Sequence, residues 1–362
     1  MNELYSANRN ISESYRNKLQ KKFFTLDQSK VFSHQTEINP QTYYLDFKNR
    51  ALDFVSKETE ILEKECLQSD NPHLILLNQT ALVDTIIQAA FYSALWFFNK
   101  QNRKELTPET APIAVLGCGG YGREEMYFRS NVDVQIVSQD SLNDEEKKWA
   151  EEIIRHFEYL FIFQNIFPAS SNSCYTVNES FEKEFTEKNI PRFISLLEHR
   201  FVTGNIFVYK KFKSSIKTLS LLHQEEITKH CLSHGGYYEV QNTVFKQEPE
   251  IKEELQRLYW ALASVRIIQK IEKANQFELL NDLFAKNLIS PLAFKSMQKG
   301  FNFLSRVRLL LHTMQRGAHR DLMSYEVREK IAETMGYEVK GFFQEYFFAA
   351  VYPLKRFSRN LY

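Results

Sequence analysis

The chain has 362 residues, of which 43% are hydrophobic and 14% aromatic, enough for two or three domains with cores of their own. The formal net charge of +1 gives no overall field that favours nucleic acid or a membrane surface as a partner. No apolar run is long enough to span a bilayer and the N-terminus lacks the pattern of a signal peptide, so we expect a cytoplasmic protein.

The first hundred residues read as helices. Eleven glycines and nine prolines are few beside 30 phenylalanines, which is typical of a helix-rich chain. Residues 1–40 are polar and mixed, and we expect them to be helical or loosely ordered. Between residues 41 and 100 apolar side chains recur at helical spacing. The aromatic group Trp96, Phe97 and Phe98 predicts packing against a neighbouring sheet.

A strand, a glycine-rich turn and a second strand come next. Residues 112–116 are apolar, as a buried strand should be. The glycines that follow lie close together: Gly117, Gly119, Gly120 and Gly122. Glycine lets the backbone approach a ligand closely, and successive backbone N–H groups in such a turn form an anion site suited to nucleotide phosphates.

The second strand, predicted at residues 131–137, alternates between polar and apolar side chains. Asn131 and Asp133 fall on one face, and Val132 and Val134 on the other. A polar pair two residues apart, on a strand beside a phosphate-binding turn, indicates a metal–nucleotide site.

The rest of the chain is predicted to be mainly helical. Asn143 or Asp144 can cap a helix that begins there. We expect one more strand at residues 172–177, and an almost entirely helical chain from Pro191 onward.

The segment from Gly119 to Asp133 resembles the nucleotidyltransferase signature of the bacterial PII uridylyltransferases (GlnD type), part of the DNA polymerase beta superfamily. The positions that agree with this signature, without a gap, are Gly119, Gly120, Tyr121, Gly122, Arg123, Glu125, Ser130 and Asp133. Asn131 stands where the family has the first carboxylate of its pair. Glu124 stands where the family usually has glycine.

Later segments resemble the same family in the same order. They are residues 191–205, 234–253, 301–312 and 326–361. The family's glycine-rich stretch before a tryptophan is missing here, although Trp260 is present. Members of the family continue into a metal-dependent hydrolase (HD) domain and ACT domains. Because the sequence has no His-Asp dipeptide, we expect these parts to be absent.

The resemblance implies an α+β fold, in which a small mixed nucleotidyltransferase sheet flanked by helices is followed by a large all-helical domain. It divides the chain into an N-terminal helical region (1–105), a nucleotidyltransferase domain (106–185) and a helical substrate or partner domain (186–362).

The chemistry of this family needs acidic metal ligands. Two Mg²⁺ ions about 4 Å apart stabilise the attacking and leaving oxygens, and carboxylates hold such ions. Asp133 offers one carboxylate, whereas Asn131 offers only a neutral carbonyl oxygen. The third strand contains no acid, and Ala169 falls near the family's third position. We therefore predict Asp133 and Asn131 as the catalytic and metal-binding pair of an incomplete site, holding Mg²⁺ weakly or at a single position.

The resemblance also implies the residues that bind the nucleotide. They are Gly119, Gly120, Gly122, Arg123 and Ser130, with Arg123 supporting either the turn or a phosphate. Candidate contacts to phosphates or substrate are Lys252, Arg308 and His312. A structural ion pair is an equally open interpretation for Arg308.

Two functions stay open at this point. In the first, the protein transfers a uridylyl or adenylyl group from an NTP to a protein acceptor such as a PII-like signalling protein. In the second, it is a catalytically weak or inactive homologue that acts as a nucleotide-sensing or protein-binding module. Neither requires nucleic acid or a membrane as partner.

Overall fold

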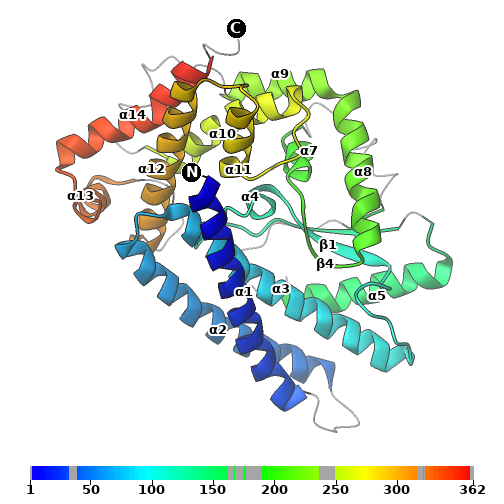
Figure 1. Ribbon diagram of the computed structural model, residues 1–362. Helices are drawn as coiled ribbons and strands as arrows, with labels where there is room; N and C mark the ends of the chain where they lie inside the picture. The colour runs from blue at the N-terminus through cyan, green and yellow to red at the C-terminus, as the bar shows by residue number, and fades with distance from the viewer. Residues whose placement is uncertain are drawn as a thin grey trace.

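A small mixed sheet lies between helices in the computed structural model, which describes residues 2–31, 39–139, 141–161, 166–167, 174–176, 190–235, 249–315, 321 and 323–358 (Figure 1). The strand order is β3-β2-β1-β4. The central strand β1 (Ile113–Gly117) pairs antiparallel with β2 (Val134–Ser138) and with β4 (Arg200–Gly204), whereas β3 (Cys174–Thr176) runs parallel to β2. The predicted α+β class, its mixed sheet and the presence of three predicted strands are confirmed, but β2 begins at Val134, so Asn131 and Asp133 lie just before the strand and not within it.

Both faces of the sheet are covered, which is why β1 is buried at every position. Ile113 and Val115 belong to the core that includes α5 (Asp144–Phe161) and the end of α3 (Pro72–Asn102). Ala114 and Leu116 belong to the opposite core, with α7 (Ile190–Leu197) and α8 (Ile206–Leu222). Phe97 and Phe98 lie in the first of these cores, so their predicted packing against the sheet is confirmed.

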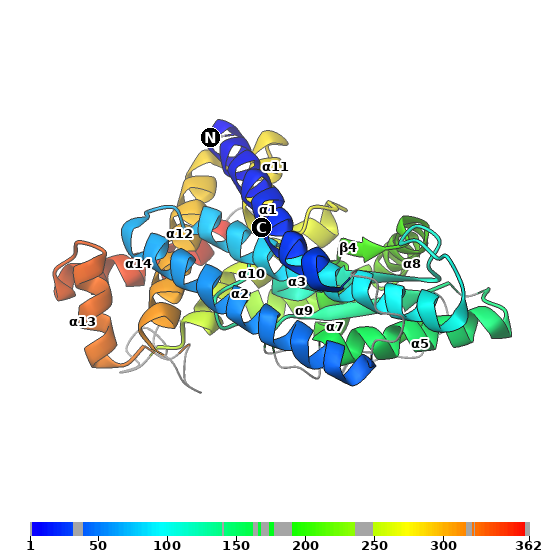
Figure 2. The ribbon, with the colours of Figure 1, turned by 90° about the horizontal axis from the view of Figure 1, so that it is seen from below.

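Three long helices precede the sheet, and Figures 1 and 2 show α1 (Asn2–Val31) and α2 (Pro40–Gln68) lying along α3. Asn39 and Asn71 cap α2 and α3 with their side chains. Each cap is followed by a proline, whose missing N–H needs no partner in the first helical turn. The predicted helical stretch is therefore confirmed, with a break before Asn71.

Helix α3 carries apolar side chains on nearly all sides, and most of its residues are buried against neighbouring helices and the sheet. It contacts α1, α2, α5, α12 and β4. Within the described ranges it is the single helix long and apolar enough to cross a membrane, and 89% of its apolar window is buried inside the protein. This burial is that of a helix packed on all sides by protein.

A reciprocal cap fixes the start of α5. The Glu146 N–H donates to Asn143 Oδ1, and the Asn143 N–H donates to Glu146 Oε2, both at 2.9 Å. Of the two caps that the sequence left open, Asn143 is the one that the structure uses.

The second half of the described chain is helical, apart from β4. Its helices after α8 are α9 (Gln224–Gly235), α10 (Ile251–Ile268), α11 (Gln276–Ala285), α12 (Pro291–Met314), α13 (Tyr325–Thr334) and α14 (Val339–Ser358). The prediction of helix from Pro191 onward is wrong for β4, where bulky and β-branched residues 201–203 pair with β1. The division of the chain at residue 186 stays a proposal. β4 lies after this boundary in the sequence, yet it is a strand of the same sheet as β1 to β3.

Close packing joins α12 to α14, and Gly300 permits it. A Cβ at Gly300 would lie 2.7 Å from the Ala349 carbonyl oxygen and 2.8 Å from Pro353 Cγ. These are backbone and ring atoms, which cannot move aside easily. The glycine therefore sets how closely the two helices approach.

We predict that Gly300→Ala lowers the free energy of unfolding by about 1–3 kcal/mol, because the added methyl overlaps its neighbours. Gly341→Ala in α14 is the matched control, since a Cβ there meets no atom within 4 Å. It should leave stability unchanged or raise it by up to about 1 kcal/mol. Urea unfolding followed by circular dichroism measures both; equal effects would show that α12 and α14 are not packed this closely.

Candidate active site

The glycine-rich turn between β1 and β2 is a single helical turn, α4 (Gly119–Gly122). The Arg123 N–H closes it with a 2.9 Å hydrogen bond to the Gly119 carbonyl. Gly119 has a φ of +54°, and a Cβ there would lie 2.9 Å from Asp133 Oδ2 and 3.0 Å from Ser195 Oγ. Glycine is therefore required for the turn to lie directly against the Asp133 carboxylate.

A cavity of about 370 Å³ lies between this turn, α7 and helices α10 and α12. Most of the predicted site residues line it, namely Gly119, Gly120, Arg123, Ser130, Asn131, Asp133, Lys252 and Arg308. Lys252 comes from the first turn of α10 and Arg308 from α12. The fold thus brings two cations of the helical half to the turn and the polar strand end.

Gly122, also predicted to bind the nucleotide, does not line this cavity. A Cβ there would lie 1.8 Å from the Glu198 carbonyl oxygen. Its role in the structure is a close backbone approach between the turn and the residue that follows α7.

His312 does not line the cavity either, because it is fully buried beneath it. The Arg129 backbone N–H donates to His312 Nδ1 at 3.3 Å, so Nε2 carries the proton and donates to Asp321 Oδ1 at 3.0 Å. The same Asp321 oxygen accepts from Arg308 Nε at 2.6 Å. The structural ion pair of Arg308 is confirmed, while its contact with a phosphate or substrate in the cavity that it lines stays a prediction.

The pKa of Asp321 reflects this arrangement. Burial would raise the pKa of its carboxyl, but the hydrogen bond from His312 and the charge of Arg308 outweigh burial and hold it below its usual range. Arg308 also lies over the Tyr127 ring, 4.1 Å from its centroid, and Nη2 donates to Ser130 Oγ at 3.4 Å. His312 and Asp321 therefore position Arg308 at the cavity wall.

Arg123 fixes the glycine turn in place through its side-chain contacts. Its Nε donates to Glu125 Oε2 at 2.8 Å, its Nη1 donates to Glu198, and its guanidinium lies 4.2 Å from the centroid of the Tyr259 ring. Burial alone would lower the pKa of Arg123, but Glu198 and Glu125 together raise it above its ordinary value. Since two carboxylates and a ring hold this guanidinium, it supports the turn; a contact between Arg123 and a phosphate stays a prediction.

The sequence interpretation missed the part played by Glu198. It is buried and lines the cavity at the end of α7. Burial raises the pKa of its carboxyl, against the opposing charges of Arg123 and Arg266. The available signal was an acid inside the segment 191–205, which resembles the family.

Glu125 ties α11 to the turn. Its Oε1 accepts from the Gln276 N–H at 2.9 Å, and Asn275 Nδ2 donates to the Arg123 carbonyl at 2.7 Å. The start of α11 therefore holds the Arg123 backbone and the Glu125 side chain, just after the glycine turn.

The donor set for a metal can be stated for the part of the chain that is described. No group of three or more His, Cys, Asp and Glu side chains lies close enough together there to hold a metal ion. Asp133 and Asn131 line the cavity together, but the carboxylates of Glu125 and Glu198 are bound to Arg123. Ala169, expected near the third family position, lies outside the described residues.

Glu124 does not supply charge to this cavity. It has a φ of +61° and its side chain is directed to the other side of the turn, where it pairs with Arg9, with Arg16 at 3.6 Å and with Arg200 at 4.0 Å. Glu124, which stands where the family usually has glycine, therefore does not supply the missing acidic metal ligand. Its carboxylate instead attaches α1 to the turn.

A glycine turn against a polar strand end, on a small mixed sheet, defines a domain of the nucleotidyltransferase class. Residues 77–161 match the family model of the nucleotidyltransferase family DUF294, and residues 224–360 match that of the GlnD PII-uridylyltransferases. The chain is therefore similar to the GlnD-type PII-uridylyltransferases over much of its helical half, and to a nucleotidyltransferase family around the glycine turn.

Three curated relatives illustrate the match, and each is described as a bifunctional uridylyltransferase/uridylyl-removing enzyme. The protein of Zymomonas mobilis is 26% identical over 80% of this chain and 32% of its own length. That of Methylococcus capsulatus is 23% identical over 65% of this chain and 26% of its own length. That of Hydrogenovibrio crunogenus is 22% identical over 82% and 32%, so the chain spans about a third of these relatives.

The two glycines of the turn should respond differently to alanine. Gly122→Ala should lower the free energy of unfolding by more than about 3 kcal/mol, or prevent folding, because its Cβ overlaps the Glu198 carbonyl. At Gly120 the nearest atoms to a Cβ are 3.8 Å away, so Gly120→Ala should change stability by less than about 1 kcal/mol. Thermal unfolding of both variants beside the wild type decides this. A stable Gly122→Ala protein would contradict the turn geometry.

Proposed function

We propose that this chain binds a nucleoside triphosphate in the cavity at the glycine turn and transfers its nucleotidyl group to a hydroxyl group of a protein acceptor. One observation carries the proposal: the turn, the Asn131–Asp133 strand end and two cations from the helical half line a single cavity. The similarity to the models of the GlnD PII-uridylyltransferases and of a nucleotidyltransferase family supports the same reaction.

The residues divide into three roles in this proposal. The Gly119–Gly120 backbone and Ser130 hold the triphosphate, with Lys252 and Arg308 neutralising its charge. Tyr259 and Trp260, which line the same cavity, offer aromatic faces for the base. Arg123 has the third role, since it fixes the turn and leaves the phosphates to Lys252 and Arg308.

A divalent cation fits this donor set at one position. Asp133 supplies the charged ligand and Asn131 a neutral oxygen, and the phosphates of the nucleotide would complete the shell. Mg²⁺, when bound, would stabilise negative charge on the phosphates. With one carboxylate fewer than the family pattern, the chain would hold the ion more weakly, since at an effective dielectric of about 20 a charge pair at 4 Å is worth roughly 4 kcal/mol.

The acceptor is inferred from the relatives. Their names describe uridylyl transfer and removal, and the matching family model is named for PII. A PII-like signalling protein is therefore the acceptor that we propose, with a uridylyl or adenylyl group as the donated part. The alternative, a nucleotide-sensing homologue without transfer, is an outcome of the test below.

The test pairs two variants with a control. Asp133→Asn should reduce transfer of labelled nucleotide from UTP or ATP to a PII protein by about 100-fold or more, because it removes the charged metal ligand. Asn131→Asp should lower the Kd of Mg·UTP or Mg·ATP by about tenfold or more, because it restores a carboxylate. Asp144→Asn, an exposed acid at the start of α5, should alter neither.

The outcomes separate the two functions. Calorimetry gives the Kd and the labelled-nucleotide assay gives the transfer rate. Nucleotide binding without transfer, even in Asn131→Asp, would contradict the transferase and support the sensing module. No nucleotide binding by the wild type would contradict both.

A further inference from the structure

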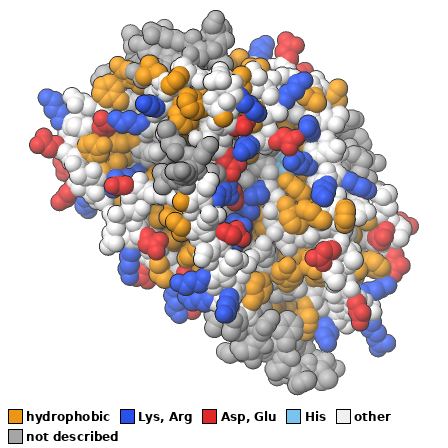
Figure 3. Space-filling model, viewed as in Figure 1, with side chains coloured by type: hydrophobic (Ala, Val, Ile, Leu, Met, Phe, Trp, Pro, Cys, Tyr) orange, Lys and Arg blue, Asp and Glu red, His pale blue; other side chains and the backbone are white. Residues whose placement is uncertain are grey.

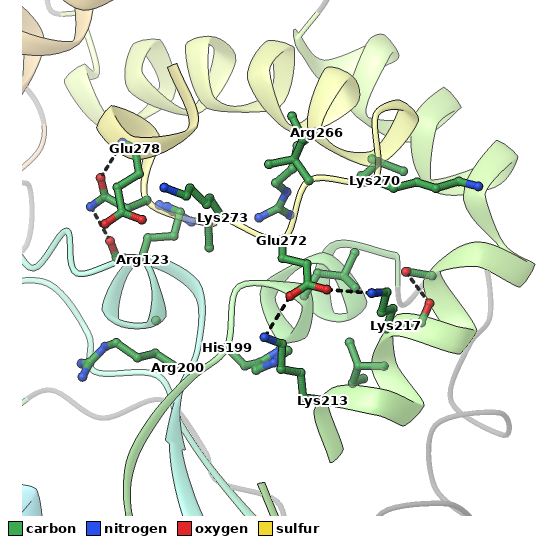
Figure 4. Close-up of a pocket in the computed structure, with 18 of the residues that line it drawn as sticks. Arg123, His199, Arg200, Lys213, Lys217, Arg266, Lys270, Glu272, Lys273 and Glu278 are labelled. Carbon is green, nitrogen blue, oxygen red and sulfur yellow. Dashed lines mark hydrogen bonds and ion pairs between the residues drawn. The ribbon is translucent and has the colours of Figure 1, made fainter. Parts of the chain in front are cut away.

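A second cavity, of about 320 Å³, lies behind the glycine turn. It is bounded by α8, the end of α10 and the segment 270–275 that leads into α11, as Figure 4 shows. On the face of the molecule shown in Figure 3, Lys and Arg side chains lie next to Asp and Glu side chains near the middle. Arg123 borders both this cavity and the first, so the two lie back to back.

Arg266 is a buried cation directed into this second cavity. Its side chain is buried, with 3% of the residue exposed, and extends from α10 toward Glu272 and Lys273 (Figure 4). Its Nη2 makes no hydrogen bond and lies 3.7 Å from Glu198 Oε1, which has no hydrogen-bond partner either. Burial lowers the pKa of Arg266, although Glu198 opposes the effect. A buried guanidinium without a full set of acceptors is costly, and an anion would complete it.

Further cations line the cavity, although the Lys270 side chain extends away from Arg266 (Figure 4). Lys270 and Lys273 line the cavity, and neither forms an ion pair with any residue that the structure describes. Lys213 and Lys217 of α8 are held by Glu272, at 3.0 and 2.7 Å, which closes the outer side (Figure 4). The cavity therefore has more positive than negative charge.

The remaining walls are apolar. They are formed by Leu197, Ile216, Leu221, Ile267, Ile271 and Ala274. Ile216 is almost fully buried and Ile267 nearly so. A cavity of a few hundred Å³ with apolar walls and a few convergent polar groups is typical of a small-molecule site.

We propose that this second cavity binds a small organic anion, with its carboxylate or phosphate against Arg266 and Lys273 and its apolar body on Ile216 and Ile267. This goes beyond nucleotidyl transfer, because it needs neither an NTP nor a metal. Since Arg266 also faces Glu198, which holds Arg123, an anion bound here would act on the ion pairs that brace the turn.

The experiment is calorimetric titration of the full chain, without nucleotide or metal, using phenyl phosphate and 3-phenylpropionate as probes. Benzyl alcohol, which has the ring but no charge, is the neutral control, and inorganic phosphate tests charge without an apolar body. The two aromatic anions should bind and the neutral alcohol should not. The tighter of the two identifies phosphate or carboxylate as the preferred group.

Two matched variants locate the binding. Lys273→Ala should raise the Kd by about tenfold or more, the loss expected for one charge-assisted hydrogen bond. Lys210→Ala, an exposed lysine of α8 outside the cavity, should leave the Kd unchanged. Ser220→Trp fills the cavity from α8 and should abolish binding while the far-ultraviolet circular dichroism stays that of the wild type.

The proposal is overturned if the wild type binds neither aromatic anion at millimolar concentration. It is also overturned if Lys273→Ala and Lys210→Ala weaken binding equally, since that would indicate general attraction to surface charge. Because the titration contains no NTP, a failure of nucleotidyl transfer leaves this result unaffected.

Discussion

The buried ion pairs of Arg123 hold the candidate active site together. One guanidinium bonds Glu125 in the turn and Glu198 after α7, and lies against Tyr259 of α10. Through these contacts a short glycine segment is attached to two elements that lie far from it in the sequence, the end of α7 and α10. Removing one partner of such a buried pair typically costs about 3–5 kcal/mol, because the remaining charge is left unpaired. The position of the cavity therefore depends on this cluster.

A second cluster of charged residues, centred on Asp84, holds the glycine turn in place from its other side. Asp84 of α3 binds Arg200 of β4 at 2.8 Å and Arg16 of α1 at 3.0 Å, and it accepts from the Tyr121 hydroxyl at 2.5 Å. Burial would raise the pKa of Asp84, but the charges of Arg200 and Arg16 keep it below its ordinary value. The N-terminal helices are thus fixed to the turn by charge as well as by apolar packing.

The sequence was most informative where local patterns carry the structure. The apolar run before the glycines, the alternation after them and the cap at Asn143 each depend on a few neighbouring residues, and each predicted its element. The polar strand end with Asn131 and Asp133 was predicted from the same local signals, and these two residues do line one cavity.

The errors came from interactions between distant segments. β4 was taken for helix because its pairing with β1 joins segments far apart in the sequence, although the bulky and β-branched residues 201–203 themselves favour a strand. Gly122 was predicted to bind the nucleotide, whereas it approaches the Glu198 backbone. Glu124, noted only as a departure from the family pattern, reaches Arg9 of α1. Glu198 was missed because only folding brings α7 against the turn.

The most direct measurement is a crystal structure of the chain with a non-hydrolysable UTP analogue and Mg²⁺. In this crystal structure we predict a triphosphate against the Gly119–Gly120 backbone, a phosphate oxygen within hydrogen-bond reach of Arg308, and one metal ion bound to Asp133. A nucleotide bound elsewhere, or two fully occupied metal sites beside the turn, would contradict it.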